Sequence, residues 1–517
     1  MLFNSYPFLL LFLPLTAIVF FRLGAYSHRL AATWLGAASL FFYGYWNPAY
    51  VSLLLASVFF NYGIGLALAR EHDASRVRRK KLILTLGIAA DLALLGYYKY
   101  ANFFLDTANS LFNTGWAVQD ILLPLGISFF TFTQIAFLVD AWSGKAREYN
   151  FIHYLLFVTY FPHLIAGPVL HHKEMMPQFA RPQTYRFSSD NMTIGLMIFG
   201  IGLFKKAVLA DGVSPYANMA FLSADAGEKL DFLAAWGGAL AYTTQLYFDF
   251  SGYSDMAIGL SRMFGIVLPL NFNSPYKATN IIDFWRRWHM TLSRFLRDYL
   301  YIPLGGNRKG PLRRQVNLML TMLLGGLWHG ASWNFVLWGG LHGVYLALNH
   351  AWRSQRERHF AHVRTGAGGK LTAWALTFVA VVAAWVFFRA ATLEGALNML
   401  SGMAGQHGVS LPATFQPGLG AAADWLQSQG VQFALGGGSR FMLTWSWVVC
   451  LLAIALFLPN AQELMRRHRP GLDFDPDAVT ARLEWRATPV WGLALAVLAA
   501  AGVLSLSQAT QFLYYQF

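Results

Sequence analysis

Residues 316–348 read VNLMLTMLLGGLWHGASWNFVLWGGLHGVYLAL and contain no Asp, Glu, Lys or Arg. A helix needs about 20 predominantly apolar residues to cross the hydrocarbon core of a bilayer. The stretch is therefore long enough for two crossings, and its length and polarity predict a pair of membrane-spanning helices.

The composition of the whole chain agrees with this stretch. Of the 517 residues, 56% are hydrophobic and 16% aromatic, whereas only 12% are charged. The charged share is about half of that in a soluble globular domain. Too few polar residues remain to build a water-soluble shell. Cys450 is the single cysteine, which excludes a disulfide scaffold and a structural zinc cluster, and we predict no bound metal.

Apolar runs of similar length recur along the chain, and we expect the first of them to be retained in the protein. The predicted crossings are 7–21, 30–46, 50–69, 82–98, 121–139, 151–170, 192–209, 233–250, 316–348 as a pair, 371–388, 441–458 and 489–506. The pattern predicts an all-α polytopic integral membrane protein with about a dozen transmembrane helices. We treat residues 1–517 as one transmembrane domain in a lipid bilayer.

The net charge of +14 resembles that of a nucleic-acid-binding protein, but its distribution favours another role. Basic residues gather in short loops between apolar runs. The loops at 70–81 and 353–370 each carry a net charge of +4, which predicts a cytoplasmic location by the positive-inside rule. The N-terminus is then outside, and the Gly-rich, nearly uncharged segment 394–438 suits the outer side. We expect no nucleic-acid partner.

The segment 249–314 breaks the apolar pattern. It alternates apolar patches with four aspartates and several arginines, so it should be buried in protein or line a cavity at membrane depth. A helix over 280–301 would place Trp285, His289, Leu292 and Leu296 on one stripe. We therefore predict a core region at 249–349 that contains a re-entrant or amphipathic segment.

Two histidines stand out as candidates for chemistry. His329 lies among small residues in the middle of the 316–348 stretch. An ionisable ring at that depth is costly unless it is partnered or functional, and imidazole suits proton transfer near neutral pH. A helix-packing histidine bonded to a carbonyl group is the alternative for His329, and an interfacial histidine is the alternative for His289.

The remaining polar residues of the apolar core are predicted to be structural. We expect four further histidines to satisfy backbone groups. Asp249 and Asp255 are six residues apart and favour a scaffold role, bonded to Ser251, Tyr253 and arginines. The histidines are His163, His171, His172 and His342.

Five separated segments carry a family resemblance. They are 160–168 (YFPHLIAGP), 249–255 (DFSGYSD), 271–276 (NFNSPY), 284–289 (FWRRWH) and 327–330 (LWHG). Together they resemble the membrane-bound O-acyltransferase family, and in particular its bacterial exopolysaccharide branch, typified by the membrane subunit of alginate O-acetylation. The resemblance extends from FNSYP at 3–7 to FLYYQF at 512–517.

The resemblance implies a ring of helices around a thin centre, with funnels from both membrane faces that meet near an invariant histidine. His329 matches that histidine, and His289 matches the second polar position of the family. His329 would be the general base for an acceptor hydroxyl, and His289 would orient the hydroxyl or donate a hydrogen bond to the oxyanion. Trp328 and Asn334, from the segment around His329, are predicted to contact substrate.

The donor implied by the resemblance is acetyl-CoA or another acyl thioester, with no cofactor bound permanently. Basic side chains at the cytoplasmic mouth would hold its phosphates, and the alternative is that they are interfacial anchors. The candidates are Lys205, Lys206, Arg286 and Arg287.

The expected function is therefore acetyl transfer from a cytoplasmic donor across a bacterial inner membrane toward an exported polysaccharide such as alginate. Periplasmic acetyltransferase or polysaccharide-modification proteins are the partners that the branch implies. Two alternatives remain at this point. One is a D-alanyl transferase of the teichoic-acid type, and the other is a transporter or channel for acyl groups or glycan precursors.

Overall fold

The computed structural model describes residues 1–70, 77–146, 150–359, 366–434, 438–475, 483–508 and 513. Arg76 and Arg364, which contribute to the two basic loops, lie outside the described residues, as does the 512–517 segment apart from Leu513. Over the described part the chain is almost entirely helical, as predicted.

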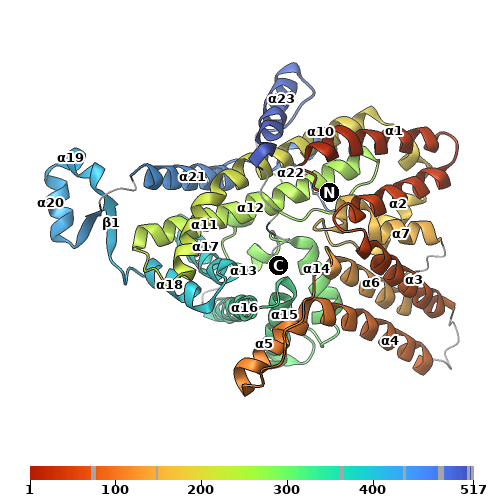
Figure 1. Cartoon of the computed structure of the whole chain (residues 1–517), viewed down its shortest axis with the longest axis horizontal. Helices are drawn as coiled ribbons and strands as arrows, with labels where there is room; N and C mark the ends of the chain where they lie inside the picture. The colour runs from red at the N-terminus through yellow and green to blue at the C-terminus, as the bar shows by residue number, and fades with distance from the viewer. Residues whose placement is uncertain are drawn as a thin grey trace.

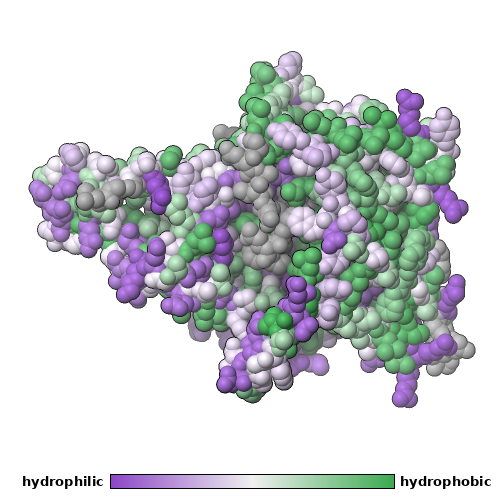
Figure 2. Space-filling view, in the orientation of Figure 1, coloured by the Kyte–Doolittle hydropathy of each residue, from purple (hydrophilic) through white to green (hydrophobic). Residues whose placement is uncertain are grey.

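The N-terminal helices form a fan at one end of the molecule, on the right of Figure 1. Apolar side chains such as Leu15 and Ile18 remain exposed on this fan, at 51% and 60%, and Figure 2 shows hydrophobic residues over its outward side. A surface of this kind fits lipid rather than water. The helices are α1 (Leu13–Gly24, after a π-helical turn Phe8–Phe12), α2 (His28–Gly44), α3 (Ala49–Arg70), α4 (Val77–Leu95), α6 (Ile127–Trp142) and α7 (Phe151–Thr159).

Two predicted crossings in this region have different bounds. The run at 151–170 is not one helix, because α7 ends at Thr159 and a short α8 (Phe161–Leu164) follows a non-helical Tyr160. The run at 121–139 becomes helical only at Ile127. α4 continues through a π-helical turn, Gly96–Tyr100, into α5 (Ala101–Phe112), and α9 (His172–Phe179) follows α8.

The buried centre of the molecule is α12 (Phe232–Met263). It packs against α10 (Ser189–Phe204). Glycines permit the close approach of the two helices. A Cβ atom on Gly195 would lie only 2.6 Å from the Gly259 carbonyl oxygen, which is too close for any other residue. A Cβ atom on Gly202 would lie 2.6 Å from the Gly252 carbonyl oxygen. Small residues of this kind let helix backbones approach closely in membrane proteins. α11 (Asp211–Asp225) and α23 (Pro489–Leu504) flank the pair.

The polar core region differs from the predicted helix over 280–301. It forms α13 (Ile281–Trp285) and α14 (Met290–Leu296), which are separated by a turn in which His289 has a left-handed backbone with φ of 43°. The prediction of one amphipathic helix is therefore wrong, although Leu292 and Leu296 are buried as expected. α15 (Gly310–His329), α16 (Trp333–His359) and α17 (Ala367–Arg389) follow.

The segment between α17 and the last helices projects from the opposite end of the molecule, on the left of Figure 1. It contains two four-residue strands, β1 (Val409–Pro412) and β2 (Val431–Ala434), which pair in parallel with Val409 opposite Val431. The chain is thus not strictly all-α. The helices after α17 are α18 (Leu393–Met403), α19 (Gln416–Leu419), α20 (Ala421–Ser428), α21 (Gly438–Phe457) and α22 (Ala461–Leu464), of which α22 lies near the centre of the molecule, beside α10.

Five helical segments of the described part are long and apolar enough to cross a membrane. They are Ala49–Arg70, Val77–Phe112, Ser189–Asp225, Ala367–Arg389 and Gly438–Phe457. Phe8–Gly24, Ile127–Trp142 and Pro489–Leu504 are shorter apolar helices. The protein is therefore a mostly helical polytopic protein.

Contacts between distant segments identify one face of the molecule. His28, at the α1–α2 turn, stacks on Tyr185 with ring centroids 4.9 Å apart. The side-chain nitrogen of Gln178 donates to the carbonyl oxygen of Val267 at 2.8 Å. The turn between α1 and α2 therefore shares a face with residues 172–187 and 264–280. Because α2 leaves this face and α3 returns to it, the end of α3 at Arg70 belongs to the same face.

Candidate active site

His329 is the last residue of α15 and lies in an aromatic cage. Its imidazole is 5% exposed. The ring centroid lies 5.0 Å from that of Trp328, 5.1 Å from that of Trp338 and 5.2 Å from that of Phe388. The aromatic surroundings of His329 are therefore mostly apolar.

Glycines set the position of this helix end. A Cβ atom on Gly326 would collide with the Phe335 carbonyl oxygen, and one on Gly339 would collide with the Met322 carbonyl oxygen. Small residues thus let the α15 and α16 backbones approach closely beside His329. Gly330 has an extended backbone with φ of −159°, so the helix stops directly after the histidine.

The carbonyl groups at the end of α15 are capped by residues from the π-helical turn Gly96–Tyr100, which precedes α5. Lys99 Nζ donates to the Trp328 oxygen at 2.6 Å and to the His329 oxygen at 3.2 Å. Tyr100 donates its hydroxyl hydrogen to the Leu327 oxygen at 3.0 Å. Helix ends leave such carbonyls without intrahelical partners, and a cation also complements the negative end of the helix dipole.

Lys99 was missed by the sequence interpretation. The signal that marks it is an unaccompanied lysine inside an apolar helix, since Lys99 falls within the candidate span Val77–Phe112. Intramembrane lysines are rare and usually functional. Its third hydrogen bond is to Ser128 Oγ at 3.2 Å.

His289 lies beside His329, with ring centroids 6.3 Å apart. The structure therefore brings together two residues that are 40 positions apart in the sequence. His289 is fully buried and packs edge-on against Phe250 at a centroid distance of 4.8 Å. The turn between α13 and α14, rather than a helix face, directs the ring inward.

A hydrogen bond fixes the tautomer of His289. Its Nδ1 lies 3.0 Å from Asn271 Oδ1, which also accepts from the Thr291 hydroxyl at 2.9 Å. The amide nitrogen of Asn271 donates to Ser254 Oγ at 3.2 Å, which supports the amide orientation. An amide oxygen only accepts, so Nδ1 carries the proton. A neutral His289 therefore presents Nε2 as an acceptor, and Asn271 is a second residue that the sequence interpretation missed.

A cavity of about 210 Å³ adjoins His329. Lys99, Trp328 and His329 line one side of it, and Trp46, from the α2–α3 turn, lines the other together with residues 122–129. The α2–α3 turn lies on the face opposite the α1–α2 turn. The cavity thus approaches His329 from the face that the positive-inside rule assigns to the outside.

The other predicted binding residues are distributed more widely. Asn334 is buried near the start of α16, and its side-chain nitrogen donates to the Ala390 oxygen at 2.9 Å. Arg286 is exposed, and Arg287 pairs with Asp283 at 2.9 Å. Trp328 contacts His329 and lines the cavity.

Lys205 and Lys206 are used within the protein core instead of at an entrance. Lys205 pairs with Asp255 at 2.7 Å, and Lys206 pairs with Asp249 at 2.7 Å and Asp211 at 2.6 Å. The prediction that arginines partner Asp249 and Asp255 is therefore wrong, because lysines do. These pairs join the π-helical turn Lys205–Ala210, which follows α10, to α12 and to the start of α11. None of the His329 contacts given above involves them.

The prediction that four further histidines satisfy backbone groups holds in part: His172 bonds a backbone carbonyl as well as a side chain, whereas His171 and His342 bond the side chains of Tyr299 and Trp285. His172 Nδ1 lies 3.0 Å from Asp140 and its Nε2 lies 3.0 Å from the Lys145 oxygen. Trp285 donates its indole N–H to His342 Nδ1 at 3.2 Å. Among the described residues no group of three or more His, Cys, Asp or Glu side chains is arranged to hold a metal ion.

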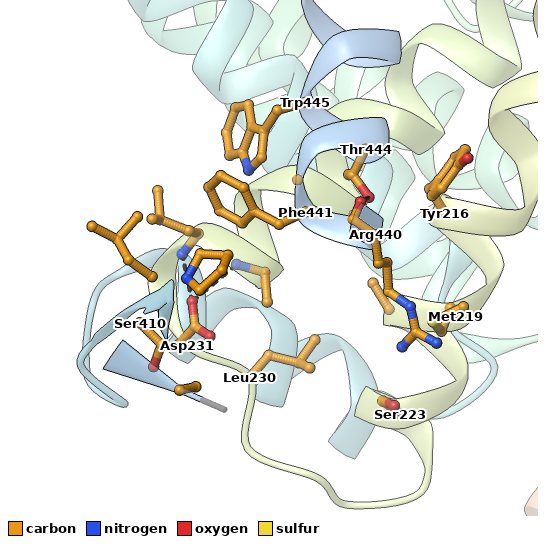
Figure 3. Close-up of a pocket in the computed structure, with 18 residues that line it drawn as sticks. Tyr216, Met219, Ser223, Leu230, Asp231, Ser410, Arg440, Phe441, Thr444 and Trp445 are labelled. Atoms are coloured by element: carbon orange, nitrogen blue, oxygen red, sulfur yellow. Dashed lines mark hydrogen bonds between the residues drawn. The ribbon is translucent and has the colours of Figure 1, made fainter. Parts of the chain in front are cut away.

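A further cavity of about 280 Å³ lies away from the histidines, beside β1 and between α11, α12 and α21. Figure 3 shows Arg440 extending from α21 toward Met219 and Ser223 of α11, whereas Phe441 and Trp445 project to the other side of α21. No titratable pair comparable to His289 and His329 lines this cavity. The candidate active site is therefore the histidine pair.

Comparison with known proteins agrees with the site. A family model described as MBOAT, membrane-bound O-acyltransferase family, matches residues 113–389. The chain is 46% identical over 439 residues to a peptidoglycan O-acetyltransferase of Helicobacter pylori, covering 80% of this chain and 81% of the relative. It is 38% identical over 529 residues to a probable alginate O-acetylase of Pseudomonas putida, covering 100% of both chains.

A more distant relative has a name that states a different activity. The chain is 30% identical over 249 residues to a teichoic acid D-alanyltransferase of Bacillus subtilis, covering 47% of this chain and 62% of the relative. The family match spans more than half of the 517 residues and includes both histidines. The chain therefore belongs to the membrane-bound O-acyltransferase family and is a multi-pass membrane enzyme of the O-acyltransferase class.

Proposed function

We propose that this enzyme moves an acetyl group from a cytoplasmic thioester to a hydroxyl group on the outer side of a bacterial inner membrane, on the way to an exported polysaccharide. The observation that carries the proposal is the pair of buried imidazoles, whose centroids are 6.3 Å apart. His329 also lines a cavity on the face assigned to the outside. About a dozen helices would form the scaffold.

His329 acts as the general base. It removes the proton of the acceptor hydroxyl while that oxygen attacks the thioester carbonyl carbon. The carbon–sulfur bond then breaks, and the proton passes from the imidazole to the departing thiolate. The products are an oxygen ester and a free thiol, and the apolar cage excludes the water that would otherwise hydrolyse the thioester.

His289 orients the acceptor. Its Nδ1–H is held by Asn271, so its Nε2 is an acceptor atom, which suits a hydroxyl hydrogen rather than an oxyanion. Stabilisation of the oxyanion then falls to a donor in the cage. The indole N–H of Trp328 suits this role, because it is buried without a hydrogen-bond partner among the described residues and lies next to His329. Preorganised donors of this kind are a major source of catalysis.

The acceptor is an exported polysaccharide, and the names of the relatives point to peptidoglycan and alginate as the two candidates. The shared chemistry is a sugar hydroxyl outside the membrane. Periplasmic modification proteins would complete the delivery, and the cavity beside His329 is where such an acceptor, or the hydroxyl of a partner protein, would approach.

The test uses purified enzyme in vesicles, with a thioester labelled in its acetyl group on one side and polysaccharide on the other. We expect labelled ester on the polysaccharide and free thiol on the donor side. His329→Ala should reach a normal membrane level but form no ester. Near-normal acetylation by this variant would overturn the base assignment, and release of intact labelled cargo without ester would favour a transporter.

A further inference from the structure

The cavity of about 280 Å³ shown in Figure 3, which we call the α12 cavity, lies on the face assigned to the outside. α12 ends at Met263, which leads into the 264–280 segment on the face of the α1–α2 turn. Its 32 residues extend for about 48 Å at 1.5 Å per residue, which exceeds the roughly 30 Å hydrocarbon core of a bilayer. The first turns of α12, which line the cavity together with β1, are therefore on the opposite face.

The lining of the α12 cavity is mostly apolar and aromatic, with a few polar groups. Figure 3 shows Phe441 and Trp445 on one side of α21, and Tyr216 and Arg440 on the other. β1 contributes the hydroxyl group of Ser410. Apolar and aromatic walls with a small number of polar groups are typical of sites for small molecules. The volume suits one small unit of a ligand rather than a loop of another protein.

Several polar groups of this lining have no partner within the described part of the chain. Asp231 Oδ1 caps α12 by accepting from the N–H groups of Leu233 and Ala234, whereas Asp231 Oδ2 accepts from no described residue. The guanidinium of Arg440 and the indole N–H of Trp445 likewise donate to none of the described residues. The cavity therefore offers a ligand both an acceptor and donors.

The charges of the lining balance each other. Of the described residues that line the cavity, Arg440 is the only base and Asp231 the only acid. A phosphate or a carboxylate ligand would meet the acid as well as the base, and sites for such anions rely on basic groups. An uncharged sugar has C–H faces that pack on aromatic rings, and its hydroxyl groups both donate and accept. The lining therefore matches a sugar better than an anion.

A short series of contacts joins the α12 cavity to the active site. Asn218, two residues after the lining residue Tyr216, accepts from Arg389 Nη2 at 2.7 Å. The residue before that arginine, Phe388, has its ring centroid 5.2 Å from that of His329. The end of α17 thus lies between the cavity and the histidine, and a polymer held in the cavity can continue along the outer face toward His329.

We propose that the α12 cavity binds an uncharged sugar unit of the exported polysaccharide and holds the polymer while another part of it reaches His329. The proposal rests on the proposed function. It identifies the acceptor as a glycan such as the strands of peptidoglycan, rather than alginate, in which every ring carries a carboxylate. The sugar ring packs against Trp445, and one of its hydroxyl groups donates to Asp231 Oδ2. Arg440 donates to sugar oxygen atoms at the other end of the cavity.

The experiment measures binding to the purified, detergent-solubilised protein by calorimetry. The probes are soluble glycan strands from peptidoglycan and alginate oligosaccharides. We expect the strands to bind, and the alginate oligosaccharides to bind at least about 10-fold more weakly. Trp445→Leu removes a stacking face, and Ala234→Trp fills the cavity from an exposed position of α12. Each substitution should weaken binding of the strands by about 10-fold, a loss of the size that one aromatic contact causes.

Trp425→Leu is the matched control, because Trp425 is an exposed indole on α20, in the same projecting part, and does not line the cavity. It should leave binding of the strands unchanged. Ala234→Trp decides the test if Trp445→Leu lowers the thermal unfolding midpoint. No binding of the strands by the wild type, tighter binding of alginate oligosaccharides, or equal binding by the wild type and Ala234→Trp would overturn the proposal.

Ester formation separates this proposal from the proposed function. In the vesicle assay, Trp445→Leu and Ala234→Trp should raise KM for the glycan strands, whereas His329→Ala should form no ester but bind the strands as the wild type does. If the wild type forms no ester from any thioester but shows the expected binding pattern, the proposed function fails and the cavity assignment stands. If ester forms but the strands do not bind through the α12 cavity, the reverse holds.

Discussion

At the scale of single residues, the reactivity of His329 depends on the residues that hold it and its partner in place. These residues are not its neighbours in the 316–348 segment. Its own carbonyl and that of Trp328 are held by Lys99, and its partner His289 is held by Asn271. Each of these contacts joins residues far apart in the sequence. The imidazoles therefore enter the reaction already oriented, which lowers the entropic cost of reaching the transition state.

The two histidines should behave as one unit. His329→Gln is expected to abolish ester formation. His289→Gln should lose less than the roughly 100- to 1,000-fold expected for deleting a catalytic hydrogen bond, because a Gln amide can donate to Asn271 and still present an acceptor oxygen. The double variant should be less than additive. Turnover of the three purified variants with acceptor present is the measurement, and full activity in His289→Ala would return this residue to a structural role.

Lys99 should be needed for activity more than for stability. Lys99→Met removes the cap of α15 but also removes a charge whose burial is costly, so the membrane level should stay near that of the wild type. Displacement of His329 by about 1 Å can cost roughly 100-fold in rate, and we expect a loss of kcat of that order. Lys99→Arg, which keeps cationic donors, should recover part of it.

The comparison with a second lysine provides the control for that test. Lys229 is remote from the cavity beside His329, and Lys229→Met should leave kcat unchanged. Equal kcat in Lys99→Met and the wild type would show that the α15 carbonyls need no cation to place His329.

At the scale of elements, the crossing of α15 and α16 is set by glycines whose missing side chains leave room for backbone. Gly326 faces the Phe335 carbonyl, whereas a Cβ atom on Gly340 would lie an ordinary 3.5 Å from Leu323. Both glycines are helical, so replacement by alanine improves helix propensity equally at the two sites. Any difference in stability or activity between the two variants therefore reports the contact of Gly326 with the Phe335 carbonyl group.

Gly326→Ala should destabilise the protein by about 1–3 kcal/mol, the usual cost of overpacking, and should lower activity because α15 ends at His329. Gly340→Ala should be neutral or slightly stabilising. Thermal unfolding midpoints in detergent and ester formation are the measurements. Equal midpoints for the two variants would mean that α15 can shift away from α16 without cost.

At the scale of the whole molecule, the cavity beside His329 lies on the face opposite the α1–α2 turn. The contacts of His28 with Tyr185 and of Gln178 with Val267 mark the other face, to which α3 returns at Arg70. The projecting part that contains β1 and β2 lies at the other end in Figure 1. A cavity on the face assigned to the outside fits an acceptor that approaches His329 from that side.

Orientation can be tested with an impermeant thiol reagent after the exposed Cys450 is replaced by serine. Cysteines at Lys80 and Arg358, in the two basic loops, should react only after the inner membrane is opened. A cysteine at Gln427, on α20, should react in intact spheroplasts. Labelling of Lys80 or Arg358 positions from outside would reverse the topology and, with it, the side from which the donor enters.

The sequence by itself determined the class of the protein, the positions of most apolar helices, the loops that carry positive charge and the choice of His329 as a candidate residue. These features follow from local properties. Whether a segment enters lipid depends on how apolar its own residues are, and the side of the membrane on which a loop lies depends on the positive charge of that loop. His329 could be found for the same reason, since an imidazole within an uncharged stretch is unusual in any fold.

Only the tertiary structure decided how the site is assembled. Four features of the core were not predictable from periodicity. They are the left-handed backbone at His289, its hydrogen bond with Asn271, the cap that Lys99 provides and the pairing of Lys205 and Lys206 with aspartates. The physical reason is that buried polar groups choose partners by distance in the folded chain, where an unpaired group is costly. That choice involves residues dozens to hundreds of positions apart, which no local pattern records.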